Sequence, residues 1–304
     1  MSEAGGQATT VAAVVFDHVS IAFDDHVVLR DLSFSLPRGA MRILLGRSGS
    51  GKSVLLKLIL GLLRPDSGTI TVNGQRIDNM VERDLLRMRA GIGMVFQGNA
   101  LFDSLTVGEN VGYRLAQDSA MPEDRVRARV GEVLGFIGLS EFIDRLPAEL
   151  SGGQRRRVAI ARAIAPAPRL LLFDDPISGL DPIIATTVDN EILKLRDLED
   201  VTSLVVTHQI RDAFYIATHQ AVRLDGRVEI GTADPAKAAQ VEFMVLHDGQ
   251  IYYQGGAAEL RASEDPYLKD YLSMTLPPWG AHSTDTASNA DRLLAPAASN
   301  HDSL

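Results

Sequence analysis

The residues best suited to chemistry form one short stretch: Gly46, Arg47, Ser48, Gly49, Ser50, Gly51, Lys52 and Ser53. Its glycines allow the backbone to curve around a phosphate with the N–H groups pointing inward. The lysine ammonium suits the β- and γ-phosphates, and the serine hydroxyl is a ligand for Mg²⁺. This G-x-x-x-x-G-K-S spacing is that of a nucleotide-binding phosphate loop. We therefore expect the whole stretch to bind a nucleotide together with Mg²⁺.

The segments on either side of this loop support the prediction. Met41 to Leu45 is an apolar run of strand length, and Val54 to Leu60 is typical of a buried helix. Strand, glycine loop and helix in this order are the context that the motif requires. The helix start adds unpaired N–H groups and the positive end of a dipole. The alternative is a Gly/Ser-rich turn without a ligand, which these flanking segments disfavour.

A second stretch also predicts an anion-binding helix start. Ser151, Gly152, Gly153 and Gln154 precede a helical pattern that continues without a breaker to residue 164. Ser151 suits the cap position, and the glycines leave the first-turn N–H groups accessible. Two such sites in one chain are explained if the second serves a nucleotide held by another copy. The arginines at 155–157 are interpreted as a solvated helix face and not as an RNA-binding patch.

Polar residues follow three apolar stretches that are predicted to be core strands. Because the carboxyl ends of parallel strands meet at one edge of a sheet, we expect these side chains to lie together. An acidic residue at that edge, beside a phosphate loop, is suited to the Mg²⁺ shell. The residues are Gln97 after 92–96, Asp174 and Asp175 after 170–173, and His208 after 203–207.

Two further residues are candidates for the nucleotide site. Phe23 ends a predicted strand, where its ring can stack on adenine, although a lone Phe is more often part of a core. Asp181 lies in the turn Ser178-Gly-Leu-Asp181, just before a predicted helix.

The whole sequence of 304 residues predicts an α/β fold with a long N-terminal pair of strands. Val222 to Val228 resembles Val245 to Ile251, and each copy predicts a strand, an Asp-Gly turn and a strand. The expected organisation is a flexible tail at 1–10, a main domain at 11–275 and a low-complexity, flexible tail at 276–304. Within the main domain we expect a helical insert at about 98–165 and an extra segment containing a β-hairpin at about 219–256.

Composition limits the function classes. The net charge of −9 argues against a nucleic-acid partner, and the hydrophobic share of 45% is ample for a core. There is no cysteine, which excludes disulfides and thiolate metal sites. We recognise neither a secretion signal nor an apolar run long enough to cross a bilayer. Any work at a membrane is therefore expected to depend on other subunits.

Taken in order, GRSGSGKS, Gln97, LSGGQ, LLLFDD, SGLD and His208 resemble the ATP-binding-cassette (ABC) ATPases over residues 12–275. The resemblance implies a P-loop NTPase (RecA-like) core, an antiparallel β subdomain, a helical insert and hydrolysis of ATP with Mg²⁺. It implies a head-to-tail dimer in which residues 151–154 of one copy contact the ATP of the other, and Asp181 meets its counterpart. By the same resemblance Gln97 senses the γ-phosphate side and the metal, Asp174 orders the metal and His208 contacts the γ-phosphate.

One position departs from the family pattern. The residue after the metal-binding aspartate is normally the glutamate that polarises the attacking water, and here it is Asp175. A general base must come within about 2.6–3.2 Å of the proton it removes, or act through a water. Because the Asp175 side chain is one methylene shorter, we predict slow but real turnover. Asp175, His208, Lys52 and Gln97 are the expected catalytic residues.

Within the family, residues 46–57, 93–102 and 106–110 and the pattern Asp265 to Tyr271 resemble the ATPase subunit of Mla-type, Mce-associated lipid transporters. This implies a separate membrane permease, an Mce-domain substrate-binding protein, lipid as cargo and a peripheral place on the cytoplasmic side of the inner membrane. Ala100 to Phe102 is the expected apolar contact for a permease helix. The duplication from Val222 to Gln250 departs from this branch.

Three other functions stay open. The first is the ATPase subunit of an importer for small polar solutes such as amino acids. The second is a cassette protein of DNA repair or translation, which the short insert and single phosphate loop disfavour. The third is a catalytically impaired ATP-binding regulator, suggested by Asp175.

Overall fold

The computed structural model describes residues 12–117 and 121–273, so the expected tails at 1–10 and 276–304 lie outside the described residues. The chain divides into two compact units, of which the first ends at Ser263 and the second begins at Glu264. In the second unit α10 (Pro266–Ser273) is described, and the Asp265 carboxylate accepts the Leu268 N–H at 3.0 Å in its first turn. None of the helices in the described ranges is long and apolar enough to cross a membrane.

A six-stranded sheet forms the centre of the first unit, with the strand order β12-β11-β3-β8-β7-β6. Its strands are parallel except for β12, which pairs antiparallel with β11 at one edge. Strands that are buried on both faces are continuously apolar, as in β3 and β7. The bounds are β3 (Met41–Gly46), β6 (Ile92–Val95), β7 (Leu170–Asp174), β8 (Thr202–Thr207), β11 (Val241–His247) and β12 (Gln250–Gly256).

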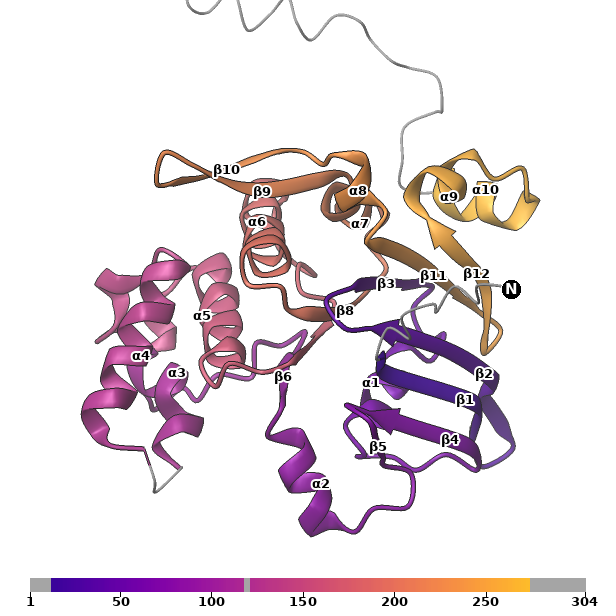
Figure 1. Ribbon diagram of the computed structural model, residues 1–304, viewed down its shortest axis with the longest axis horizontal. Coiled ribbons are helices and arrows are strands. Elements are labelled where there is room, and N and C mark those ends of the chain that lie inside the picture. The colour runs from indigo at the N-terminus through magenta and orange to yellow at the C-terminus, as the bar shows by residue number, and fades with distance from the viewer. Residues whose placement is uncertain (1–11, 118–120, 274–304) are drawn as a thin grey trace, which may run out of the picture. The chain divides into compact units, whose positions relative to one another are not determined.

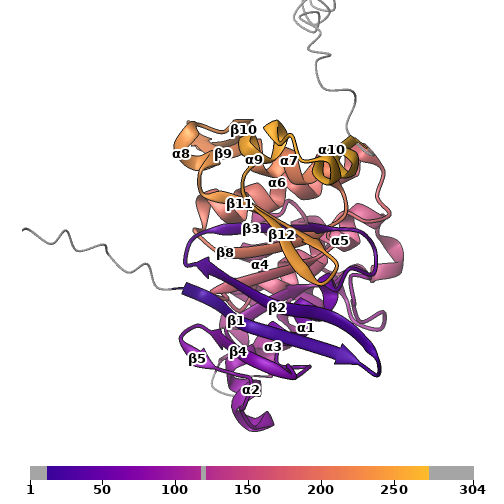
Figure 2. The same cartoon turned by 90° about the vertical axis from the view of Figure 1, so that its right-hand side faces the viewer.

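A second, antiparallel sheet has the order β2-β1-β4-β5. Its strands are β1 (Ala12–Phe23), β2 (His26–Pro37), β4 (Ser67–Val72) and β5 (Gln75–Arg76). Helix α1 (Lys52–Ile59) lies between this sheet and the central one, as Figures 1 and 2 show. Leu55, Leu56, Leu58 and Ile59 of α1 belong to one buried apolar cluster with residues of both sheets. Burying a side chain of this size contributes about 1.5–3 kcal/mol, so this cluster fixes the helix that follows the phosphate loop.

The segment between β6 and β7 is mainly helical. Helices α3 (Val107–Ala116), α4 (Glu123–Phe136) and α5 (Gly152–Ile164) pack against one another, with the short η1 (Ser140–Phe142) and η2 (Pro147–Glu149) between the last two (Figure 1). Before them α2 (Glu82–Arg89) leads into β6. The buried Asn110 side chain donates to the carbonyls of Phe102, Leu105 and Thr106, and this fixes the loop before α3.

The two copies of the duplicated segment occupy different places. The second copy is β11 and β12, and β11 pairs with β3 in the central sheet. The first copy is β9 (His219–Leu224) and β10 (Arg227–Thr232), which form a separate two-stranded sheet next to α6 (Pro182–Leu198). Both turns are Asp-Gly pairs with positive φ, as two-residue hairpins require.

Polar contacts fix the first hairpin to α6. Arg196 donates to the carbonyls of Ile216 and His219, and Asp197 accepts the Ala221 N–H. The remaining helices of the first unit are α7 (Ile210–Thr218), α8 (Pro235–Ala238) and α9 (Ala257–Ala262). Helix α8 ends at Ala238, shortly before β11 begins at Val241.

Candidate nucleotide site

Four neighbouring parallel strands end at the same edge of the central sheet. In the order β3, β8, β7 and β6, their carboxyl ends carry or lie within two residues of Gly46, His208, Asp174 and Gln97. Because neighbouring strands lie about 4.8 Å apart, these residues form one row. The strand order therefore brings together the polar residues that the sequence singles out.

The phosphate loop joins β3 to α1. Lys52 Nζ donates to the carbonyls of Gly46 at 2.7 Å and Arg47 at 2.8 Å. Gly51 has φ +100°, and a Cβ there would lie 2.9 Å from Leu29 Cδ2, so this position needs glycine. Burial lowers the pKa of Lys52, while Asp175 and Asp174 act to raise it.

This loop fits a phosphate. Arg47, Ser48 and Gly49 form its exposed part. Helix α1 begins without a side-chain cap and without an acidic residue in its first turn, which leaves its N–H groups accessible to an anion. The buried Ser50 hydroxyl has no hydrogen-bond partner among the described residues, and it can donate a hydrogen bond to a phosphate oxygen.

Two groups suited to Mg²⁺ lie together beside the loop. The Ser53 hydroxyl donates to Asp174 Oδ1 at 3.2 Å. Burial raises the pKa of Asp174, and the hydrogen bond from Ser53 opposes that shift. Within residues 12–117 and 121–273 no three His, Cys, Asp or Glu side chains gather as a metal site. Mg²⁺ usually binds one or two carboxylates plus phosphates and waters, so the pair of Ser53 and Asp174 fits it.

Gln97 has a partner within the chain at this edge of the sheet. Its amide Nε2 donates to the Ser178 hydroxyl at 3.2 Å, in the turn that follows β7. The side chain is exposed at the same edge of the sheet as Asp174. The structure therefore brings Gln97 to the site and shows it in contact with the turn that leads to Asp181.

Asp175 directly follows Asp174 and contacts both Thr207, the last residue of β8, and His208, which follows it. His208 Nδ1 lies 2.7 Å from Asp175 Oδ2, and the Thr207 hydroxyl donates to Asp175 Oδ1 at 2.9 Å. The Asp175 backbone has φ +51°, a left-handed conformation that aspartate adopts more readily than most residues. The sequence patterns did not single out Thr207, although its place just before His208 was a signal for it.

The second predicted anion site begins α5. Ser151 Oγ accepts the Gln154 N–H at 3.2 Å, and Gln154 Oε1 accepts the Ser151 N–H at 2.8 Å. This capping box uses the Gln154 side chain within its own helix. A Cβ at Gly153 would lie 2.2 Å from Ile184 Cγ2, so this glycine permits close packing of α5 on α6. Ser151 is exposed and Gly152 is half-buried.

Asp181 caps α6 beside this helix start. Its carboxylate accepts the N–H groups of Ile183 and Ile184, both at 3.1 Å. Ile183 is 82% exposed.

The interpretation of the arginines at 155–157 as a solvated face is wrong for Arg156. This residue is only 3% exposed, and its guanidinium donates to the carbonyls of Phe96 and Gln97, both at 2.6 Å. Arg162, further along α5, donates in the same way to Ala100 and Asn99. Arg156 is buried because the strand end that carries Gln97 packs against α5, and its charge is matched by backbone carbonyls.

Phe23 ends β1 and pairs with His26 in the turn to β2. Val28, in the next part of β2, faces Gly51, because a Cβ on Gly51 would lie 3.1 Å from Val28 Cγ1. The Phe23 ring is 42% exposed. A partly exposed ring at the end of the strand that pairs with β2, the strand that faces Gly51, is suited to stacking on a base.

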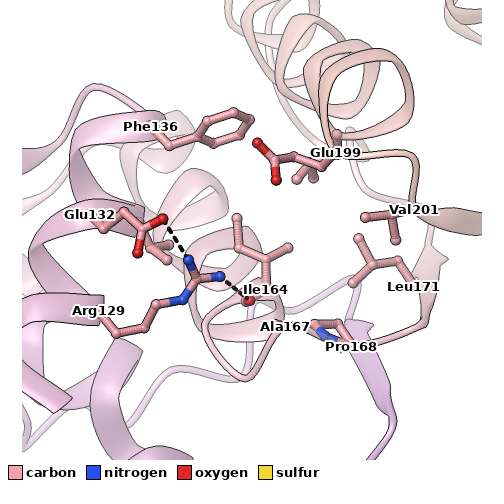
Figure 3. Close-up of a pocket in the computed structure, with 11 residues that line it drawn as sticks. Arg129, Glu132, Phe136, Ile164, Ala167, Pro168, Leu171, Glu199 and Val201 are labelled. Atoms are coloured by element: carbon pink, nitrogen blue, oxygen red, sulfur yellow. Dashed lines mark hydrogen bonds and ion pairs between the residues drawn. The ribbon is translucent and has the colours of Figure 1, made fainter. Parts of the chain in front are cut away.

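A cavity of about 240 Å³ lies elsewhere, near the start of β7. Figure 3 shows Arg129, Glu132, Phe136 and Glu199 around it, with Leu171 of β7 among the apolar residues that line it. The length of β7 separates this cavity from Asp174, so it is not part of the site. A groove of about 720 Å³ lies between α3 and α4 and includes Tyr113 and Val126.

Comparison with known proteins agrees with this geometry. The family model "ABC transporter" matches residues 29–178. The sulfate/thiosulfate import ATP-binding protein CysA of Mycobacterium tuberculosis H37Rv is 41% identical over 220 residues, which are 72% of this chain and 61% of that protein. The chain therefore spans about three fifths of the length of that relative.

Two further proteins extend the comparison. The chloroplastic protein TRIGALACTOSYLDIACYLGLYCEROL 3 of Arabidopsis thaliana is 32% identical over 263 residues, 84% of this chain and 72% of that protein. A solved dimeric structure of the ATP-binding cassette MJ0796 with ADP and Pi is similar with a TM-score of 0.64 and 28% identity. The matched region covers 80% of this chain and 98% of the MJ0796 chain. The P-loop NTPase fold is thus confirmed, and the chain belongs to the ABC transporter family as an ATPase domain.

Proposed function

We propose that this chain is the ATP-hydrolysing subunit of an ABC importer and drives a separate membrane permease. The observation that carries the proposal is the row of Gly46, His208, Asp174 and Gln97 at four adjacent strand ends, beside a loop that fits a phosphate. The similarity to an import ATP-binding protein over 72% of the chain supports it. Its place is peripheral, on the cytoplasmic side of the inner membrane, where ATP is available.

The chemistry at each site is attack of a water on the γ-phosphate. Lys52 binds the outer phosphates, and Ser53 and Asp174 hold the Mg²⁺ that neutralises phosphate charge. The Asp175 carboxylate accepts the proton of the attacking water, so that the water oxygen bonds to phosphorus as the bond to the leaving ADP oxygen breaks. His208 lies against Asp175 and contacts the γ-phosphate. Phe23 stacks on adenine.

A second copy of the chain completes each site. The exposed Ser151, the open N–H groups at the start of α5, Asp181 and the exposed Ile183 form one surface without a role inside the chain's own phosphate loop. MJ0796, which is 28% identical, is described as a dimer in its complex with ADP and Pi. We propose that this surface covers the nucleotide held by residues 46–53 of the partner copy, head to tail.

The permease contacts the helical segment. Phe102 and Tyr113 are both exposed, and their ring centroids lie 4.5 Å apart. They stand next to the groove between α3 and α4. An exposed aromatic pair beside a groove suits the apolar face of a short helix. Arg162, whose guanidinium lies 5.8 Å from the Phe102 ring, connects this surface to α5.

The relatives point to two kinds of cargo. The relative named for sulfate and thiosulfate import favours a small polar solute, and this is our main proposal. The protein TRIGALACTOSYLDIACYLGLYCEROL 3, which is named after a galactolipid, aligns over 84% of the chain. It favours a lipid as the second candidate cargo. The second candidate is the Mla-type system with an Mce-domain protein.

Purification of the assembled complex from its native host tests the proposal. The full-length chain is captured through an affinity tag, and its partners are identified by mass spectrometry. A permease with a solute-binding protein supports the importer, whereas a permease with an Mce-domain protein supports the lipid transporter. Capture of no permease, together with ATP hydrolysis equal to that of Lys52→Ala, would overturn the function.

A further inference from the structure

The Asp175 carboxylate has two distinct sides. Oδ1 accepts a hydrogen bond from the Thr207 hydroxyl at 2.9 Å, and Oδ2 lies 2.7 Å from His208 Nδ1. Thr207 is buried, whereas the His208 side chain is 49% exposed. Oδ1 therefore faces the protein interior, and Oδ2 faces the accessible side of the site.

Further hydrogen bonds orient the Thr207 hydroxyl and the Asp175 backbone. The hydroxyl oxygen accepts the Gln209 N–H at 3.0 Å, which leaves its single proton for Asp175. The Asp175 N–H donates to the Val206 carbonyl at 2.7 Å, so β8 fixes this backbone as well. The last torsion of an aspartate side chain is broad and roughly two-fold, so the backbone alone does not select which oxygen faces the site.

We infer that Thr207 is a positioning residue that orients the Asp175 carboxylate for catalysis. The inference rests on the proposed ATPase function. The Thr207 hydroxyl occupies Oδ1 and keeps Oδ2 toward His208 and the attacking water. A glutamate at this position would carry its carboxylate one methylene further from β8, out of the reach of this hydroxyl. The positioning role of Thr207 therefore depends on the base being an aspartate and not a glutamate.

Steady-state ATP hydrolysis by the full-length chain tests this inference. Thr207→Val keeps the shape of the side chain and removes the hydroxyl, and we expect kcat to fall roughly tenfold, as for a lost hydrogen bond to a charged acceptor. KM for ATP is expected to stay within about twofold, because the phosphate and metal ligands are unchanged. Thr207→Ser restores the hydroxyl and is expected to recover most of the wild-type kcat.

Thr202 provides a matched control at the other end of β8. It is buried like Thr207, and its hydroxyl accepts the Gly39 N–H at 3.0 Å. Thr202→Val removes a buried hydroxyl from the same strand, so it is expected to lower the melting temperature without the tenfold loss of kcat. A general weakening of β8 would affect both variants alike.

A second measurement uses the Asp175→Glu background. There the longer side chain carries its carboxylate away from Thr207, so Thr207→Val is expected to change kcat by less than about twofold. The same tenfold loss in both backgrounds, or a wild-type kcat for Thr207→Val beside an inactive Lys52→Ala, would overturn the inference and leave the ATPase function standing. A wild-type chain no more active than Lys52→Ala would overturn the ATPase function itself.

Discussion

The guanidinium of Arg156 donates to the main-chain carbonyl of Gln97 at 2.6 Å, and this bond joins the helix that begins at Ser151 to the strand end that faces the chain's own phosphate loop. A second donor of the same group binds the Phe96 carbonyl. The planar fork of arginine serves two carbonyls at once, which a lysine ammonium does less well. In the proposed dimer, Arg156 thus connects two nucleotide sites. It joins the surface that covers the partner's nucleotide to Gln97, which faces the nucleotide held by its own chain.

Arg156→Lys is therefore expected to weaken that connection. Leaving one buried carbonyl without its donor costs about 1–3 kcal/mol, so the melting temperature falls. Gln97 is held less firmly, so kcat falls and the dependence of the rate on ATP concentration becomes less cooperative. The measurements are thermal unfolding and a full ATP titration of the rate.

Arg162→Lys is the matched control, because Arg162 lies on the same helix and binds the Ala100 and Asn99 carbonyls instead. It should lower stability by a similar amount and leave the cooperativity of the ATP titration unchanged. If both variants alter the titration equally, the bond to Gln97 has no special role.

Asp175 is expected to control the chemical step and not the binding of ATP. Asp175→Asn removes the proton acceptor, so we expect kcat to fall by about 100-fold or more, which is the usual contribution of a general base. Affinity for ATP, measured with a fluorescent analogue, should change by less than about twofold. A kcat equal to that of the wild type would show that another group accepts the proton.

Asp175→Glu gives the opposite expectation. The extra methylene brings the carboxylate nearer to the attacking water, so kcat should rise. The left-handed backbone at this position, with φ +51°, favours aspartate, so the same variant should melt at a lower temperature. Rate and melting temperature are measured on the same preparation, and a fall in kcat would show that the shorter side chain is the better fit.

The head-to-tail arrangement predicts complementation between two inactive variants. Lys52→Ala disables the phosphate loop, and Ser151→Trp blocks the start of α5. In a mixed dimer one site carries both defects and the other carries none. An equal mixture should therefore regain about a quarter of the wild-type rate, if half of the dimers are mixed and each has one working site.

Ser151→Ala is the control for this experiment, since Ser151 also caps α5 and loss of the cap costs about 1 kcal/mol. It should lower the melting temperature and keep far more activity than Ser151→Trp. A mixture that stays as inactive as its components would contradict the shared site.

The sequence predicted the local elements and the row of strand ends well, because both depend on patterns within a few residues. Apolar runs with β propensity gave β3, β7 and β8, and the glycine loop placed the start of α1. Two contacts could not be predicted, because they join residues far apart in the sequence. Thr207 and Asp175 lie 32 positions apart, and Arg156 and Gln97 lie 59 positions apart. Burial of a charge depends on which carbonyls the fold brings to it.

The duplicated hairpin shows how weak a repeat is as evidence for equivalent structure. Both copies form a hairpin through an Asp-Gly turn, as predicted. Only the second joins the central sheet, because β11 is apolar on both faces, whereas the first copy carries Gln220 and Arg223. Helix α7 was not predicted from the sequence. Its buried residues nevertheless have helical spacing: Ile210, Ala213, Phe214 and Ala217.

A buried carboxyl between α6 and α7 predicts how stability depends on pH. Both oxygens of Asp189 lack a hydrogen-bond partner among the described residues. Burial, with a smaller effect of Asp212, raises the pKa of Asp189 to about 8, and Arg211 opposes the shift. The unfolded carboxyl ionises near its ordinary value of 3.8 while the folded one still holds its proton. The unfolded state therefore binds fewer protons, and stability falls as the pH rises from about 4 to about 8, by at most roughly 1.4 kcal/mol per pH unit.

The asparagine side chain in Asp189→Asn cannot ionise, so this variant should not show the loss of stability between about pH 4 and pH 8. We expect the variant to be more stable than the wild type at pH 8 and to lose most of that advantage by pH 5, as measured by urea unfolding across this range. Asp197→Asn is the contrasting variant. The buried Asp197 carboxylate is paired with Arg196 at 2.7 Å, so its replacement by a neutral side chain should lower the stability of the protein. If Asp189→Asn gave the same difference in stability at pH 5 and pH 8, Asp189 would not be the group that titrates between them.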